Sequence, residues 1–195
     1  MIDIMELNNE MTAQKSLQLI SETLNNSRRS ILSNGAKYFI LWGSLLVVFS
    51  LAIYFLWHTT GNPRWNLLWF VMPAVGFPIS FCLRKKDVHV PESFVGNMIS
   101  HAWKIYCVFA VSISAIAVLL VPMFLSFAIV LILGMTMCFT GALLKSWIII
   151  IGGFILGVGG AAATMLIMSD AELLLFTVGG LLLVAIGLIE KHQNK

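Results

Sequence analysis

The chain has 195 residues, of which 59% are hydrophobic and only 11% are charged. A soluble domain of this length usually has about a quarter of its residues charged, and its single core has no room for this apolar surplus. The composition therefore excludes an ordinary soluble domain and predicts an all-α integral membrane protein. The net charge of +3 is small, but its distribution along the chain is uneven and informative.

Residues 1–36 form a polar N-terminal segment with an amphipathic helix at about residues 12–33. Leu17, Ile20, Leu24 and Ile31 recur there with the alternating spacing of three and four residues that is typical of a helix with one apolar seam. The seam is short and Ser27 interrupts it, so a coiled coil that is stable by itself is not favoured.

We expect Thr12 to cap the start of this helix and Asn34-Gly35 to end it, because both residue types at its end tolerate a left-handed backbone. A cleavable signal peptide is not expected, because this segment is polar and contains acidic residues. Three interpretations of the helix remain open. It lies along the cytoplasmic membrane surface, it pairs with a partner helix, or it packs on the bundle's own loops.

Six apolar spans follow within a membrane domain of residues 37–190, and residues 191–195 form a short tail. The uninterrupted apolar run 105–144 would be about 60 Å long as one helix, twice the thickness of a bilayer core, so it must fold back. Pro122 is the expected breaking point, and Ser169-Asp170 is the expected turn before the last span. The predicted spans are residues 38–57, 65–83, 102–121, 123–144, 147–168 and 171–189.

Basic residues predict the orientation of these spans. With six crossings, one side receives Lys15, Arg28, Arg29, Lys37, Arg84, Lys85, Lys86, Lys104, Lys145, Lys191 and Lys195, whereas the other side receives Arg64 together with Asp170 and Glu172. By the positive-inside rule, we expect both termini to be cytoplasmic.

Small residues predict how two of the spans pack. In the fifth span Gly153, Gly157 and Ala161 recur every four residues, and the fourth span repeats this spacing with Gly134 and Cys138. In a bilayer, small residues hold helices together by allowing close approach of their backbones. We expect the fourth and fifth spans to pack face to face, and the alternative is that the glycine face joins two copies of the chain.

The second span contains Pro73, Gly76 and Pro78. Each proline removes a helical hydrogen bond, which indicates either a simple kink or a hinge that lines a cavity. The irregular second and fifth spans occupy the middle of each three-span half, as in transporters with inverted repeats. This pattern supports an alternative function, a small transporter or flippase-like protein for an apolar or amphiphilic solute.

Residues for catalysis or metal binding are not apparent in this sequence. The spans carry no ionisable residue near the bilayer centre, and the zincin, Walker and nucleophile-elbow motifs are absent. We therefore expect no enzymatic activity, cofactor, metal or nucleic-acid partner. Arg84, Lys85, Lys86 and Lys104 are expected either to set topology or to bind anionic lipid headgroups at the cytoplasmic face.

Several short motifs resemble those of a known family. They are Ser16-Leu17-Gln18-Leu19-Ile20, Leu41-Trp42-Gly43, Leu68-Trp69-Phe70-Val71-Met72-Pro73, Arg84-Lys85-Lys86, Leu133-Gly134-Met135, Gly141-Ala142-Leu143-Leu144-Lys145 and Ile151-Gly152-Gly153. With this pattern the chain resembles a family of small, uncharacterised bacterial inner-membrane proteins with six spans. The resemblance implies a location in the bacterial cytoplasmic membrane, and it implies no activity or functional residue.

The leading functional hypothesis from the sequence is a non-enzymatic scaffold or regulatory component of the bacterial inner membrane. Its N-terminal helix would be the element that contacts a protein partner or a second copy of the chain. The hypothesis follows from an amphipathic helix attached to spans that lack buried chemistry.

Overall fold

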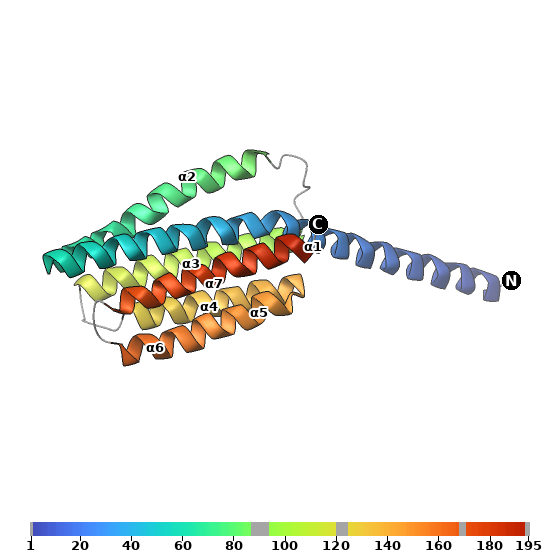
Figure 1. Ribbon diagram of the computed structural model, residues 1–195. Coiled ribbons are helices and arrows are strands. Elements are labelled where there is room, and N and C mark those ends of the chain that lie inside the picture. Colours follow the sequence, from blue (N-terminus) through green and yellow to red (C-terminus); the bar gives the residue numbers. More distant parts are fainter. Residues whose placement is uncertain (1, 87–93, 120–124, 168–170, 194–195) are drawn as a thin grey trace.

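The computed structural model describes residues 2–86, 94–119, 125–167 and 171–193, and these residues are almost entirely helical, with no strand among them (Figure 1). Six helical segments in this part of the chain are long and apolar enough to cross a membrane, as predicted. The elements are α1 (Ile2–Thr60), the 3-10 helix η1 (Pro63–Phe70), α2 (Val71–Lys86), α3 (Phe94–Leu119), α4 (Leu125–Leu144), α5 (Trp147–Phe154), the π-helix η2 (Ile155–Gly159), α6 (Gly160–Leu166) and α7 (Glu172–Gln193).

Helix α1 differs from the prediction because it is continuous from Ile2 to Thr60. The expected start at Thr12 and the expected stop at Asn34-Gly35 were both wrong. Packing explains the missing stop. Ile31 lies against the hydrophobic core on one side of the glycine, and Ala36, on the other side, is 1% exposed. These contacts hold both flanks in helical geometry, although a glycine inside a helix costs about 1 kcal/mol.

The actual end of α1 is at Gly61, which has a φ of 65°. Its N–H donates to the Trp57 carbonyl at 2.8 Å, a left-handed helix stop that glycine adopts without a steric cost. Asn62 then caps η1 by accepting from the Arg64 N–H at 3.0 Å, with Pro63 at the first helical position. The chain therefore reverses direction within a few residues and enters the second span through a 3-10 turn.

Helices α1 and α7 form an extensive antiparallel interface built on small residues. A Cβ on Gly43 would lie 2.7 Å from the Gly180 carbonyl oxygen, and a Cβ on Gly187 would lie 2.8 Å from the Ala36 carbonyl oxygen. Further along the same interface the hydroxyls of Ser50 and Thr177 form a hydrogen bond of 2.8 Å. The two helices are therefore in close backbone contact over much of their length.

The remaining spans fit the predicted order but with shifted bounds. The third span begins at Phe94, well before the expected residue 102, and the fourth begins at Leu125. The fifth span is α-helical at both ends and π-helical at Ile155–Gly159, within its glycine-rich part. The predicted turns at Pro122 and at Ser169-Asp170 lie outside the described residues.

Figure 1 shows how these helices are arranged. Helices α1, α3, α4 and α7 run side by side, α2 lies over α1, and α5 with α6 follows α4 at the opposite side. The N-terminal part of α1 extends past the bundle at the end where α7 ends. The core cluster contains Val95, Met137, Leu144, Ile149, Leu156, Leu183 and Ile186.

Candidate functional site

The N-terminal part of α1 extends beyond the bundle, and we call its residues 2–23 the stalk (Figure 1). Its side chains are described from residue 14 onward, and all of them up to residue 23 are exposed. Leu17 is 66%, Leu19 64% and Ile20 57% exposed. Leu17 and Ile20 share the apolar seam and form a candidate contact surface, whereas Leu19 lies off this seam.

The next segment of α1, residues 24–33, forms the stalk base and packs on the bundle. Leu24, Ile31 and Leu32 lie against the hydrophobic core. The Arg28 Nε donates to the Leu143 carbonyl at 3.0 Å. This carbonyl belongs to the last turn of α4, where backbone acceptors lack helical partners and the helix dipole favours a cation. The base therefore fixes the direction in which the stalk leaves the bundle.

A second tie joins α7 to the turn between α4 and α5. The Ser146 hydroxyl donates to the Glu190 carboxylate, and its oxygen accepts from the Ile149 N–H at 3.3 Å as the N-cap of α5. Glu190 is only 3% exposed. The turn itself is tight, because Lys145 adopts a φ of 56°. The stalk base and the end of α7 are thus both attached to residues 143–146.

Sequence reasoning missed this pair of attachments. From the sequence, Arg28 was only one of the basic residues that predict orientation, and Glu190 had no predicted role. The sequence did contain one signal for Glu190. This carboxylate directly follows the last apolar span, whereas the charged residues after it, Lys191 and Lys195, are basic. The link from Arg28 to α4 could not be derived from the sequence.

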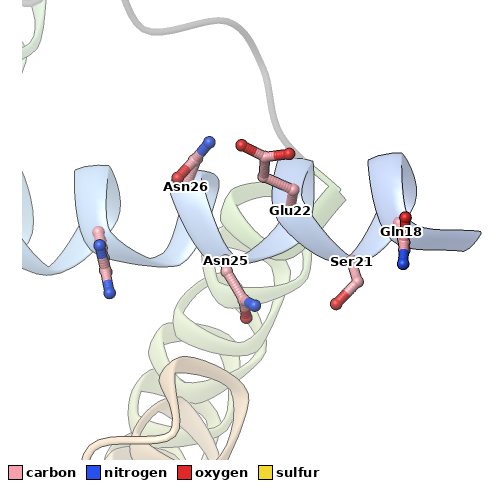
Figure 2. Close-up of a pocket in the computed structure, with 6 residues that line it drawn as sticks. Gln18, Ser21, Glu22, Asn25 and Asn26 are labelled. Atoms are coloured by element: carbon pink, nitrogen blue, oxygen red, sulfur yellow. The ribbon is translucent and has the colours of Figure 1, made fainter. Parts of the chain in front are cut away.

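A polar stripe covers a different face of the stalk and its base. It consists of Gln18, Ser21, Glu22, Asn25, Asn26 and Arg29, and Figure 2 shows the first five of these following one another along the helix. These side chains are amides, a hydroxyl and one charge of each sign. Among the described residues, no group of three or more His, Cys, Asp or Glu is placed to hold a metal ion.

The predicted packing residues of the fourth and fifth spans are brought together by the structure. A Cβ on Gly157 would lie 2.8 Å from the Gly134 Cα, and a Cβ on Gly153 would lie 2.8 Å from the Cys138 backbone nitrogen. Ala161 is 2% exposed. The glycine face is therefore covered within the chain, which leaves it unavailable for the alternative of joining two copies.

The proline-containing second span packs closely on the first span. Pro73 and Pro78 lie within α2, and Gly76 packs against Trp42 of α1, where a Cβ would lie 2.7 Å from the indole ring. Helix α2 therefore packs on α1, whereas the fifth span packs on α4 and α7. The structure does not bring Gly76 and Gly157 together.

A small cavity of about 30 Å³ lies elsewhere, at the junction of α1, α4, the fifth span and α7. Its lining is Leu46, Val130, Leu133, Leu156, Gly160, Thr164, Leu175, Phe176 and Gly179. This volume corresponds to about one water molecule in the liquid. It is too small for the apolar or amphiphilic solute of the transporter hypothesis.

The basic residues predicted to contact headgroups are distributed over two helices. The backbone of Arg84, Lys85 and Lys86 forms the end of α2, and their side chains lie outside the described part. Lys104 is exposed on α3. The end of α2 and the start of α3 lie at the stalk end of the bundle (Figure 1).

Comparisons of the chain with protein families, with curated proteins and with solved structures found no match.

Proposed function

We propose that this protein is a multi-pass component of the bacterial cytoplasmic membrane that acts as a non-enzymatic scaffold or regulatory subunit. Both termini would lie in the cytoplasm, and the stalk would be the element that contacts a protein partner. The observation that carries the proposal is an exposed apolar surface on a helix whose base is fixed to the bundle.

The membrane location is supported by the outer surface of the bundle. Leu166 is 85%, Met135 75% and Trp147 74% exposed, and these three are among many large apolar side chains that face outward. Each such side chain gains about 1.5–3 kcal/mol when it leaves water for an apolar environment. Hydrocarbon around the six helices would cover this surface.

The orientation is supported by the position of the charges along the helices. Lys37, Lys145 and Lys191 lie at the end of the bundle from which the stalk extends, where α2 also ends in Arg84-Lys85-Lys86. Arg64 and Glu172 belong to the opposite end. Basic residues concentrate on the cytoplasmic side of membrane proteins, so the stalk would extend into the cytoplasm.

The scaffold role is supported by the geometry of α1. The helix is continuous from the stalk into the first span, and the Arg28–Leu143 hydrogen bond holds its base. A helix of 22 residues is about 33 Å long, so the stalk would reach well beyond the headgroups. This geometry supports a helix that projects from the bundle over one that lies flat on the membrane surface, another of the three interpretations of the sequence.

Proximity labelling in intact cells tests the proposal. A labelling enzyme is fused to the C-terminus, two residues after the end of α7, which lies near the stalk base (Figure 1), and the full chain is compared with a variant that lacks residues 2–23. This variant retains Leu24, Arg28 and Ile31, so the contacts of the base with the bundle are preserved. We expect the full chain to label specific membrane or cytoplasmic proteins that the shortened chain does not label.

The experiment has one control and one result that would contradict the proposal. Equal thermal unfolding of the two chains in detergent shows that the shortened bundle is folded. An identical set of labelled neighbours, with equal membrane levels of both chains, would contradict the scaffold role of the stalk.

A further inference from the structure

One face of α3 is exposed along the length of the helix. The opposite face, with Val95, Ile99 and Trp103, packs on the core of the bundle. The exposed face carries a straight row of side chains, because their spacing alternates between three and four residues. We call it the α3 row, and it consists of Phe94, Asn97, His101, Lys104, Val108, Val111 and Ala115.

The chemistry of the α3 row changes along its length. Asn97, His101 and Lys104 are polar, whereas Val108 and Val111 below them are apolar. Helix α3 contains no Asp or Glu, so the charge of its polar part is positive. This polar part lies toward the stalk end of the bundle, where α3 begins (Figure 1). The row thus combines a basic end with an apolar continuation.

Two aromatic side chains lie at the level where the row changes from polar to apolar. The rings of Trp103 and Tyr106 contact each other edge to face, with their centroids 5.8 Å apart. Trp and Tyr collect at the level of lipid headgroups in membrane proteins. Lys104 lies in the same helical turn, so in a membrane its ammonium would reach the headgroups and Val108 would face acyl chains.

The ring of His101 is oriented by its own helix. Its Nδ1 lies 2.8 Å from the Asn97 carbonyl oxygen. A carbonyl oxygen can only accept a hydrogen bond, so Nδ1 is the protonated nitrogen in this contact. The Nε2 is therefore the ring nitrogen that can meet a ligand, and Lys104 follows three residues later on the same face. Together they offer two neighbouring contacts to one headgroup.

We propose that the α3 row binds one phospholipid with an anionic headgroup. The Lys104 ammonium pairs with the phosphate, the His101 Nε2 contacts the same headgroup, and an acyl chain lies along Val108 and Val111. Charge complementarity favours an anionic lipid over a zwitterionic one. This site shares the membrane location and orientation of the proposed function, but it does not depend on the stalk.

A second copy of the chain is a poorer occupant of the α3 row. Two copies in one membrane share an orientation, so paired α3 helices would place Lys104 at the same depth as its equivalent, and like charges repel. Helix contacts in lipid are also built on small residues. Among Val108, Val111 and Ala115, only the last is small, in contrast to the glycines between α4 and the fifth span.

Native mass spectrometry of the full-length protein in a mild detergent tests the proposal. The two probes are dioleoyl phosphatidylglycerol, which is anionic, and dioleoyl phosphatidylethanolamine, which is zwitterionic and has the same acyl chains. A titration with each probe gives the Kd of the first lipid adduct. Equal thermal unfolding of the variants in detergent shows that each of them is folded.

We expect phosphatidylglycerol to bind about fivefold or more tightly than phosphatidylethanolamine, and Lys104→Gln to remove about fivefold of its affinity. His101→Gln should weaken it about threefold, the effect of one hydrogen bond. Lys191→Gln is the matched control, since Lys191 is also exposed at the stalk end of the bundle but belongs to α7. It removes the same charge and should change the affinity less than twofold.

The position of the acyl chain is tested by cross-linking. A phosphatidylglycerol with a photoreactive diazirine in one acyl chain should label residues 105–115. Val108→Trp should reduce this labelling at least twofold, because the larger ring occupies the place of the chain. Val178→Trp on α7 is the control, since Val178 is exposed to a similar extent, 61% against 65%, and should leave the labelling unchanged.

Four results would overturn the proposal. They are equal affinities for the two lipids, equal effects of Lys104→Gln and Lys191→Gln, labelling mainly outside α3, and a dimer in sedimentation that Val108→Trp dissociates. In the last case a second copy would occupy the row. The failure of the scaffold role is a separate result, namely unchanged cellular neighbours when residues 2–23 are removed.

Discussion

Glu190 and Ser146 show how a polar pair is accommodated at the end of an apolar helix. The Ser146 hydroxyl donates to the Glu190 carboxylate and also accepts the Ile149 N–H, so one oxygen serves both α5 and α7. A carboxylate with 3% exposure needs such hydrogen bonds, because burying a charge without partners is costly. The pair therefore contributes to the stability of the stalk end of the bundle.

Replacing Ser146 by alanine should lower the free energy of unfolding by about 1–3 kcal/mol, because it removes both an N-cap and a donor to a buried carboxylate. A denaturant titration of the protein in detergent measures this change. Ser114→Ala is the control, since the Ser114 hydroxyl bonds the Ala110 carbonyl within its own helix at 2.7 Å. Equal effects of the two substitutions would show that the contact with Glu190 contributes nothing.

Two glycines of α1 should respond to alanine in opposite directions. No described atom lies within 4 Å of a Cβ on Gly35, and its backbone is helical, so Gly35→Ala should stabilise the protein by about 0.4–1 kcal/mol. A Cβ on Gly43 would lie 2.7 Å from the Gly180 carbonyl oxygen, so Gly43→Ala should destabilise it. The same titration measures both variants, and a destabilising effect of Gly35→Ala would indicate that the helix bends at this position.

The hairpin of the fourth and fifth spans is held by backbone contact. Gly134 faces Gly157, and Gly153 faces Cys138. Because these residues are small, the backbones of the two helices lie close together. Van der Waals contact between closely spaced backbones stabilises helix pairs in lipid, where burial of apolar area gives little advantage. The π-helix Ile155–Gly159 lies within this contact region.

Gly157→Leu should loosen this hairpin, because even a Cβ would lie 2.8 Å from the Gly134 Cα. Overpacking of this kind costs about 1–3 kcal/mol and more where the backbone cannot move. Gly159→Leu is the control within the same π-helix, since no described atom lies within 4 Å of its Cβ position. The thermal stability of both variants in detergent is the measurement, and unchanged stability of Gly157→Leu would contradict the packing.

The whole molecule is polar at one end and apolar along its sides. Six helices among the described residues are long and apolar enough to cross a membrane. The stalk and most of the basic residues belong to one end of the bundle, and Arg64 belongs to the other end. This distribution is the basis for the proposed orientation, and it leads to a direct test by chemical labelling.

Single cysteines in a background without Cys82, Cys107 and Cys138 should report this orientation. We expect a Thr59→Cys variant to react with a membrane-impermeant maleimide on intact spheroplasts, and a Gln18→Cys variant to react only in inverted vesicles. Both positions are exposed. The reverse pattern would place the stalk outside the cytoplasm and contradict the proposed function.

The six helices could be predicted because length and hydropathy alone decide whether a segment can span a bilayer. The contact between Gly134 and Gly157 follows a local spacing that the sequence displays. The continuous α1 could not be predicted from Asn34-Gly35, because distant contacts of Ile31 and Ala36 override the local stop signal. Helix α1 ends instead at Gly61, where the residues on both sides of the glycine are exposed.

The α1–α7 interface was missed, although a signal for it exists. Ala36, Gly43 and Ser50 recur every seven residues, and Gly180 and Gly187 show the same spacing. A repeat of small residues indicates a helix interface, but it does not identify the partner helix. The pairing became apparent only from the structure, as did the attachment of Arg28 to Leu143.

The order of synthesis gives this interface a further consequence. Ser50 and Thr177 are separated by 127 residues, whereas Cys138 and Ile150 of the α4–α5 hairpin are separated by 12. The ribosome therefore completes the α4–α5 hairpin long before it synthesises α7. Until then, the small-residue face of α1 has no partner helix to pack against. A chain interrupted before residue 172 would retain its hairpin but leave that face open to chaperones and membrane proteases. Packing of α7 on α1 would then be the last step in the assembly of the bundle.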